Sequence, residues 1–399
     1  MRRRRRRSKR RLPPGADHGI SLTVNLLLNL TAFFLVFPFL LTQQLRCCLM
    51  SPNQYDNAAH LVEVWRGQII ESRHRGHLIA VDANGTQICA LGSPQTVTYL
   101  RSSGKAFQAL PVVTSGAADR FGFTEREIAI ACGSHNGEPI HVDTVRSMLN
   151  KIGLDESALK CGAHEPYSVD VARELIQKGE RPSPIQNNCS GKHAAMLALA
   201  KHVDAPTESY DELVNPVQQM ILQTVSDFSG VPVEEIAIGI DGCGVPVFGI
   251  SVRAMALMYA RLVSPPSTFT SETRDACKRI VAAIIAYPEM IGGTKDRLDT
   301  ELIRAAAGTL ISKIGAEGVY TVGVLPSADW PNGIGFALKI EDGDDKRARP
   351  PAVIDALRQL GVLSRESLAA LSKYSPETIM NRRGDHVGEA RAAFTLQVK

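Results

Sequence analysis

The sequence has 399 residues, of which 44% are hydrophobic and 22% are charged, a globular composition with enough material for one large domain or two modest ones. The formal net charge is +4, but the first twelve residues hold nine basic side chains and no acidic one, so the remaining chain is slightly acidic, which argues against nucleic-acid binding. Eight cysteines are spread thinly along the chain, which favours free thiols over the dense disulfide framework of a small secreted domain.

The chain opens with an arginine-rich segment and then an apolar one. The run from Ile20 to Leu41 has no charged residue and is long enough to span a bilayer, which takes about 20 residues. One interpretation is a single-pass inner-membrane anchor with the arginines in the cytoplasm. The other is a mis-assigned start at Met1 of a cytoplasmic protein, because Met50 directly precedes a plausible soluble sequence. We predict an N-terminal extension over residues 1–53 and one folded domain over residues 54–399.

The next part of the chain predicts antiparallel hairpins. Apolar and β-branched runs are separated by turn residues; these runs lie at 62–65, 68–71, 77–81 and 86–90. From Ser103 to about Leu310 helical spacing dominates, with helices expected at 105–113, 125–131, 141–152, 192–202, 211–228 and 271–286.

Strand patterns return near the C-terminus. They lie at 318–325 and 333–340, and helices are expected to follow at 351–360 and 365–372. Strands at both ends with helices between them predict an α+β fold, in which N- and C-terminal strands form one antiparallel sheet and a helical lobe is inserted between them. A cleft between the two lobes would be the usual place for a pocket.

Ser102 and Lys105 stand three residues apart, so a helix would place them on one face. A serine hydroxyl becomes a good nucleophile when a base takes its proton. A lysine is such a base only if desolvation or a second cation lowers its pKa toward neutrality. The spacing therefore suggests acyl transfer. It is not specific, because Ser157 and Lys160 repeat it in what we interpret as an ordinary solvated helix end.

Four further clusters of polar residues and glycines accompany this motif, at 132–138, 186–193, 241–246 and 311–318. Each has an ordinary explanation by itself, such as a small buried cysteine, a locally satisfied histidine or a turn. Together they combine Ser-x-x-Lys with a second serine in Gly-Ser-His-Asn and a Ser-Lys-x-Gly before an inner strand. This is the layout of serine acyl enzymes in which a second lysine lies beside the first. A second positive charge there would lower the pKa of Lys105.

On these motifs the chain from about Leu61 to the C-terminus resembles the Rhizobium etli-type L-asparaginase family, also called asparaginase II. The fold of that family is similar to the serine β-lactamases and the bacterial glutaminases. The matching segments are 101–105, 131–138, 188–193, 239–246 and 313–318. The resemblance implies an amidohydrolase that converts the small molecule L-asparagine to L-aspartate and ammonia, and that forms a homodimer.

The resemblance also implies which residues form the site. Two Ser–Lys pairs fall on Ser102 with Lys105 and on Ser134 with Lys313. The residues implied to bind substrate are Arg101, His135, Asn136 and Asp241.

A zinc ion is implied as well, held by two cysteines and a lysine. By motif these ligands are Cys189, Lys192 and Cys243. A lysine ligates a metal only as the neutral amine, so zinc binding itself would have to lower the pKa of Lys192.

The expected mechanism begins when Lys105, kept neutral by burial and by Lys313, takes the proton of Ser102. Ser102 then attacks the side-chain amide of asparagine, and Ser134 relays protons between the two lysines. Within enzymes, the alternative is a related serine amidase or glutaminase, or an acylase that recognises β-lactams. In another class, the alternative is a membrane-tethered binding protein that has lost turnover.

Overall fold

The computed structural model describes residues 57–399, which belong to the compact unit Asn53–Lys399. The predicted extension over residues 1–53, including the apolar run at 20–41, lies outside the described residues. Within residues 57–399, no helix is both long and apolar enough to cross a membrane. The six cysteines of this part are buried and free, which confirms for them the prediction of thiols.

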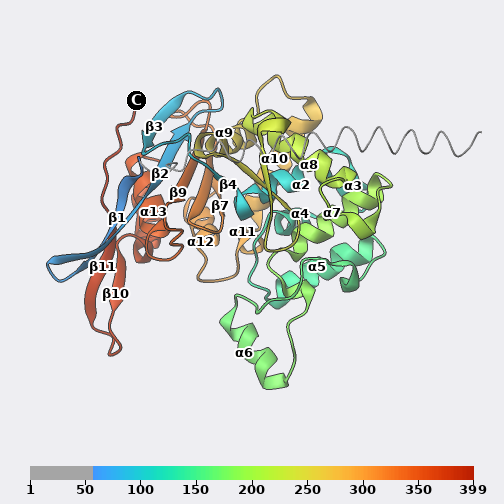
Figure 1. Cartoon of the computed structure of the whole chain (residues 1–399), viewed down its shortest axis with the longest axis horizontal. Coiled ribbons are helices and arrows are strands. Elements are labelled where there is room, and N and C mark those ends of the chain that lie inside the picture. Colours follow the sequence, from blue (N-terminus) through green and yellow to red (C-terminus); the bar gives the residue numbers. More distant parts are fainter. Residues whose placement is uncertain (1–56) are drawn as a thin grey trace, which may run out of the picture. The chain divides into compact units, whose positions relative to one another are not determined.

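One antiparallel sheet is built from both ends of the described chain (Figure 1). Its strand order is β10-β11-β1-β2-β9-β8-β7, and β3 also pairs with β2. The bounds are β1 (Ala59–Arg66), β2 (Ile69–Val81), β3 (Gln87–Leu91), β7 (Leu310–Ile314), β8 (Val319–Val324), β9 (Ile334–Ile340), β10 (Glu377–Met380) and β11 (His386–Ala392). The N-terminal β2 pairs with the C-terminal β9, with Ile79 opposite Ala337. The predicted α+β sheet made from both chain ends is therefore confirmed.

Some strand predictions were wrong in detail. The expected strands at 68–71 and 77–81 are parts of the single strand β2, because the polar residues between them stay paired with β1, as in Ser72 opposite Val64. Polar side chains on an exposed face do not end a strand whose backbone hydrogen bonds continue. The strands β7, β10 and β11 were not predicted.

Helices fill the interval between β4 and β7 and form the lobe that Figure 1 shows beside the sheet. A small sheet with the order β4-β6-β5 supports this lobe. Its strands are β4 (Val97–Tyr99), β5 (Ala237–Ile240) and β6 (Pro246–Ser251). The helices of the lobe are α2 (Lys105–Thr114), α3 (Ala117–Arg120), α4 (Glu125–Ala131), α5 (Pro139–Lys151), α6 (Val169–Lys178), α7 (Ser190–His202), α8 (Pro216–Ser229), α9 (Val252–Val263), α10 (Ser271–Ala286), α11 (Pro288–Ile291) and α12 (Leu298–Ala305).

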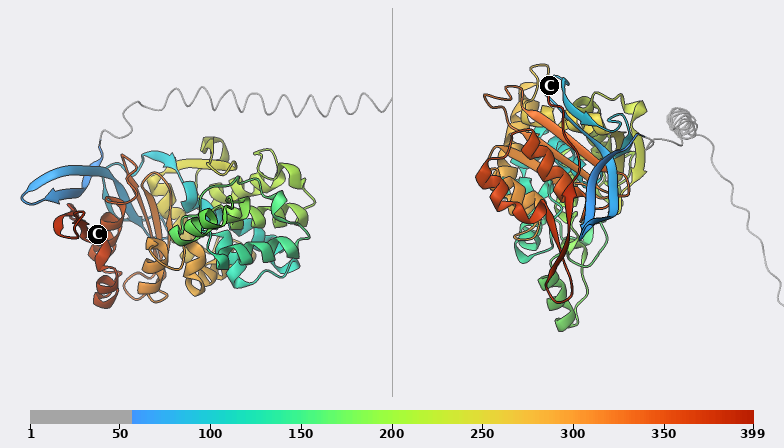
Figure 2. Two further views of the ribbon diagram at one scale, coloured as in Figure 1. Left: turned by 90° about the horizontal axis from the view of Figure 1, so that it is seen from below. Right: turned by 90° about the vertical axis from the view of Figure 1, so that its left-hand side faces the viewer.

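The two faces of the sheet pack against different helices. Alternate residues of a strand point to opposite faces, and in β2 the pair Ile79 and Val81 joins the core of the inserted lobe, whereas Leu78 and Ala80 join a second core. The second core includes helix α13 (Arg349–Gln359), which is followed by α14 (Arg365–Ala370). Figure 2 shows these C-terminal helices and the inserted lobe on opposite sides of the strands. Burial on both faces explains why β8 and β9 are buried along their whole length and mostly apolar.

Candidate active site

A cavity of about 550 Å³ is lined by segments of the inserted lobe, by the end of strand β7 and the residues that follow it, and by residues at and just before the start of α13. Three residues of the predicted site line it, namely Ser102, Ser134 and Asn136. These three come from two segments of the lobe that are separate in sequence. A pocket where the lobe meets the end of a sheet strand agrees with the predicted cleft.

Ser102 lies in a 3-10 turn, Arg101–Gly104, and not inside an α-helix as its spacing from Lys105 had suggested. The preceding Arg101 has φ +49°, a left-handed conformation that is uncommon for a residue other than glycine. Such strain persists where the surrounding structure enforces it, often at functional sites. The turn presents the half-buried Ser102 to the cavity.

Lys105 is the first residue of α2 and is completely buried. Its Nζ donates to the carbonyl oxygens of Gly133, at 2.5 Å, and Asn188, at 3.0 Å, and it makes no hydrogen bond to Ser102. Burial lowers the pKa of Lys105, the Cys189 sulfur opposes this effect, and the charge of Lys192 adds to it. The strongest cationic influence on this pKa is therefore Lys192, where the sequence had suggested Lys313.

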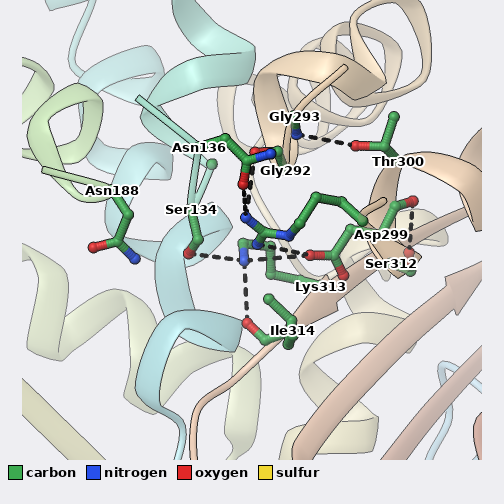
Figure 3. A network of polar contacts seen from close by, with 12 residues as sticks. Ser134, Asn136, Asn188, Gly292, Gly293, Asp299, Thr300, Ser312, Lys313 and Ile314 are labelled. Carbon is green, nitrogen blue, oxygen red and sulfur yellow. Dashed lines mark hydrogen bonds and ion pairs between the residues drawn. The ribbon is translucent and has the colours of Figure 1, made fainter. Parts of the chain in front are cut away.

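Ser134 and Lys313 form the Ser–Lys pair that is hydrogen-bonded in the structure. Lys313 shares a face of β7 with Ile311, which packs into the inserted lobe, so its side chain points toward that lobe. Its Nζ donates to Ser134 Oγ at 3.0 Å and to the Ile314 carbonyl oxygen at 3.1 Å (Figure 3).

Burial lowers the pKa of Lys313 from 10.5 to about 7. The Asp299 carboxylate opposes this shift, and the charges of Lys105 and Arg297 add to it. A lysine with such a pKa is partly neutral at physiological pH, and a neutral amine next to a serine hydroxyl is a suitable general base.

Gly133 allows the close approach that places Ser134. A Cβ at Gly133 would lie 2.1 Å from the Met290 carbonyl oxygen, and the Ser134 N–H donates to the next carbonyl, that of Ile291, at 2.8 Å. The loop after α4 is thus pressed against the end of α11. A residue with a side chain at position 133 could not make this close backbone contact.

We expect Gly133→Ala to lower the free energy of unfolding by about 1–3 kcal/mol, because a backbone oxygen must shift to admit the methyl group. Urea denaturation measures this change. Gly104→Ala is the matched control, since its Cβ would meet Leu100 at an ordinary 3.5 Å and its φ of −78° suits alanine. Equal stability of the two variants would contradict the expected clash.

The residues predicted to bind substrate occupy different places. Asn136 lines the cavity. Arg101 and Asp241 pair with each other, with Nε and Oδ1 2.9 Å apart, and neither is among the residues that line this cavity. His135 is buried, with its Nε2 3.0 Å from the Ser190 hydroxyl, so it supports the start of α7 and does not reach the cavity lining.

The predicted zinc ligands lie together under the start of α7. Lys192 Nζ donates to the Cys243 sulfur at 3.1 Å, and Cys189 and Cys243 are hydrogen-bonded to each other. That bond lowers the pKa of Cys189 well below its usual value, and the charges of Lys105 and Lys192 lower it further. Burial acts in the opposite direction but is outweighed. Burial alone would lower the pKa of Lys192. The sulfurs of Cys243 and Cys189 outweigh burial and raise this pKa above its ordinary value.

No group of three or more His, Cys, Asp or Glu side chains in residues 57–399 is arranged to hold a metal ion. The predicted set contains two cysteines and a lysine, so only two of its three side chains are of those types and the third is an amine donor.

The sequence matches the model of one protein family, described as L-asparaginase II, over residues 62–392. The chain belongs to the L-asparaginase II family. It is therefore an amidohydrolase that acts on a small-molecule substrate. A comparison with curated proteins finds no match.

Solved structures similar to this L-asparaginase II family member include glutaminases and a β-lactamase. One is the Bacillus subtilis glutaminase in covalent complex with 5-oxo-L-norleucine, with 13% sequence identity, a TM-score of 0.36, and coverage of 73% of this chain and 89% of that one. Another is a β-lactamase from Burkholderia ambifaria, with 14% identity, a TM-score of 0.34, and coverage of 72% and 93%.

Several residues that line the cavity of this family member were missed by sequence reasoning, most importantly Arg297 and Glu138. Arg297 Nη1 donates to Asn136 Oδ1 at 2.6 Å, and Asn136 Nδ2 donates to Glu138 Oε1 at 3.2 Å. The available signal was the pair Gly292-Gly293 just before Arg297. A Cβ at Gly293 would lie 2.1 Å from Asn136 Nδ2, so glycine is needed there for the loop to approach the site.

The second Ser-x-x-Lys of the chain has other partners. Ser157 Oγ donates to Asp155 at 2.5 Å, and Lys160 Nζ donates to the Glu208 carbonyl oxygen and to Asp211. Ser157 and Lys160 are exposed to solvent. The interpretation of this copy as an ordinary solvated element is consistent with these contacts.

Proposed function

We propose that this amidohydrolase hydrolyses L-asparagine to L-aspartate and ammonia through a serine acyl-enzyme. The observation that carries the proposal is that Ser102 and Ser134 line one cavity while Lys313, with a pKa of about 7, donates to Ser134. A substrate in this cavity would therefore meet two serine hydroxyls, one of them next to a lysine that changes its charge near neutral pH.

In the proposed first half-reaction, Lys105 takes the proton of Ser102 as the oxygen attacks the side-chain carbonyl carbon of asparagine. In the structure the Lys105 amine donates to two backbone carbonyls and is also hydrogen-bonded to the Cys189 sulfur, so it has to turn from one of these partners to Ser102 when it takes the proton. Backbone N–H groups near Ser102 would stabilise the oxyanion, at about 3 kcal/mol per donor.

The C–N bond then breaks, and ammonia leaves with a proton supplied through Ser134 from the lysines. An aspartyl ester of Ser102 remains. In the second half-reaction a water molecule attacks that ester after giving its proton to the neutral lysine pair. The ester bond breaks, the proton returns to Ser102 Oγ, and L-aspartate is released.

We further propose that Cys189, Lys192 and Cys243 hold a zinc ion. The three side chains are buried and in contact with one another, and thiolate sulfurs are preferred zinc ligands. The donor set therefore fits the ion. When bound, zinc would neutralise the thiolate charge and hold the neutral form of Lys192. The adjacent Asn188 carbonyl, which accepts from Lys105, would be fixed in place by the same segment.

Cys189→Ser and Cys243→Ser are expected to lower the zinc content of the purified full chain several-fold, because hydroxyl oxygen is a poorer zinc ligand than thiolate. Elemental analysis after dialysis measures the bound metal. Cys277→Ser is the control, since Cys277 is an equally buried free thiol on α10. Zinc content that stays equal in all three variants would contradict the site.

Two measurements test the proposed reaction. The first compares ammonia release from L-asparagine and L-glutamine, and hydrolysis of a chromogenic β-lactam, by the full chain; asparagine is expected to be the best substrate. The second stops the reaction with acid and seeks the aspartyl ester by mass spectrometry. Trypsin separates the two candidate serines, because Ser102 lies in the peptide 102–105 and Ser134 in the peptide 127–146. An ester absent from peptide 102–105 during turnover contradicts the assignment.

A further inference from the structure

Asp299, the second residue of α12, is a buried carboxylate whose oxygens lack a hydrogen-bond donor at normal distance and angle. Its side chain is 0% exposed, and neither Oδ1 nor Oδ2 has a hydrogen-bond partner in the described structure. Leaving a charged group in this state is costly unless cations stand close to it. An unsatisfied carboxylate at such a depth therefore calls for a specific explanation.

Two cations share one oxygen of this carboxylate. Asp299 Oδ2 lies 3.9 Å from Lys313 Nζ and 4.0 Å from Arg297 Nη2. Figure 3 shows Asp299 beside Lys313, on the side opposite Ser134. Both distances exceed hydrogen-bond length, so the interaction is electrostatic and leaves the donors of the two cations free for other groups.

Those other groups belong to the cavity. Lys313 donates to Ser134, and Arg297 donates to Asn136. Ser134, Asn136 and Arg297 all line the cavity. Asp299 thus lies next to two cationic side chains, one of which contacts Ser134 and the other Asn136. Its negative charge offsets the repulsion between these two cations.

We propose that Asp299 is a positioning residue that holds Lys313 against Ser134 and Arg297 against Asn136. Arg297, fixed in this way, presents its guanidinium to the α-carboxylate of the amino-acid substrate. A planar guanidinium matches a carboxylate in geometry and charge. The inference rests on the proposed function, because it assumes an amino-acid amide in the cavity.

The charged and titratable groups that face Lys313 have opposite influences. Asp299 raises the pKa of Lys313, while Lys105 and Arg297 lower it. The sulfurs of Cys189 and Cys132 face it as well. Asp299 itself is faced by three tyrosines, Tyr259, Tyr320 and Tyr374, and by Arg349.

Removing Asp299 and removing Arg297 must therefore move the acidic limb of the pH–rate profile in opposite directions. With the full chain and L-asparagine, we expect Asp299→Asn to move the acidic limb of kcat/KM by about 1–3 pH units toward lower pH. Arg297→Gln should move it toward higher pH and raise KM about 10-fold or more, with a smaller effect on kcat. A merely structural role of Asp299 predicts neither displacement.

Thr300→Val is the matched control on the same helix. Thr300 is also fully buried, and its Oγ1 donates to the Pro288 carbonyl oxygen and accepts from the Gly293 N–H. Its loss is expected to lower stability without moving the acidic limb. If Asp299→Asn leaves the limb in place in an active enzyme, the inference is overturned while the proposed function stands.

Lack of ammonia release by the wild-type chain would instead overturn the proposed function. The inference is then decided by NMR titration of lysine side chains labelled at Cε, with the Lys313 signal assigned by its loss in Lys313→Met. An unchanged Lys313 titration in Asp299→Asn overturns it. Should Asp299→Asn not fold, Arg297→Gln decides alone, and a limb that stays or moves toward lower pH rejects the inference.

Discussion

Ser102→Ala is expected to lower ammonia release from L-asparagine by a factor on the order of 10⁴ or more, because no other group can form the ester with the same geometry. The fold should be unaffected. The Ser102 hydroxyl, half-buried at the cavity, makes no hydrogen bond within the described residues, so it holds no neighbour in place. Turnover at saturating asparagine and thermal unfolding by circular dichroism measure the two effects.

Ser103→Ala is the matched control for this prediction. The adjacent Ser103 is buried, and its Oγ donates to the Leu100 carbonyl oxygen at 2.6 Å. Its loss should lower the free energy of unfolding by about 1 kcal/mol and leave turnover nearly unchanged. The opposite pattern, with activity retained in Ser102→Ala and lost in Ser134→Ala, would assign the nucleophile to Ser134, which the structure already pairs with a lysine.

The fold was predictable where local periodicity and burial agree. The helices α4 and α10 begin and end at the residues predicted for them, because each starts at a threonine cap and buries one apolar face. The division of β2 into two strands failed for a physical reason. Its polar middle, such as Ser72, is held by pairing with β1, and tertiary pairing of this kind leaves no local pattern.

The site was predictable as a set of motifs but not as a set of contacts. The spacing of Ser102 and Lys105 suggested a hydrogen-bonded pair, whereas the buried Lys105 amine turns to two backbone carbonyls. The contact between Ser134 and Lys313 joins residues 179 positions apart, so only a resemblance could suggest it. Arg297 and Asp299 escaped notice because an arginine and an aspartate near a helix start look like ordinary surface residues. Their burial is a property of the packed structure.

Lys313→Met is expected to lower kcat/KM by about 10²–10⁴-fold, the usual contribution of a positioned proton-transfer group. In the wild type, kcat/KM should rise with pH through about 7 as Lys313 loses its proton, since only the neutral amine accepts one. The variant should lose this acidic limb. A limb near pH 7 that persists at full height in Lys313→Met would contradict the role of Lys313 as the titrating base.

The same substitution makes a prediction about stability, with a defined sign. The folded-state pKa of Lys313, about 7, lies below its unfolded value of 10.5. Between these values only the unfolded chain binds the proton, so this lysine makes the free energy of unfolding rise with pH from about 7 to about 10.5. Below pH 7 the folded state contains the buried, charged Lys313 amine. The pKa difference, at about 1.4 kcal/mol per unit, makes the cost of this buried charge a few kcal/mol. Lys313→Met should stabilise the protein most at low pH and flatten this slope.

Lys339→Met separates this effect from the general cost of burying a lysine. Lys339 is nearly as buried, lies on strand β9 of the same sheet, and has a pKa that burial lowers as well. Its amine, however, donates to the Glu317 carbonyl oxygen and not to either serine. Urea denaturation from pH 6 to pH 10 should therefore show a changed slope in both variants. Ammonia release should lose its acidic limb only in Lys313→Met, because only that amine contacts a serine hydroxyl of the cavity.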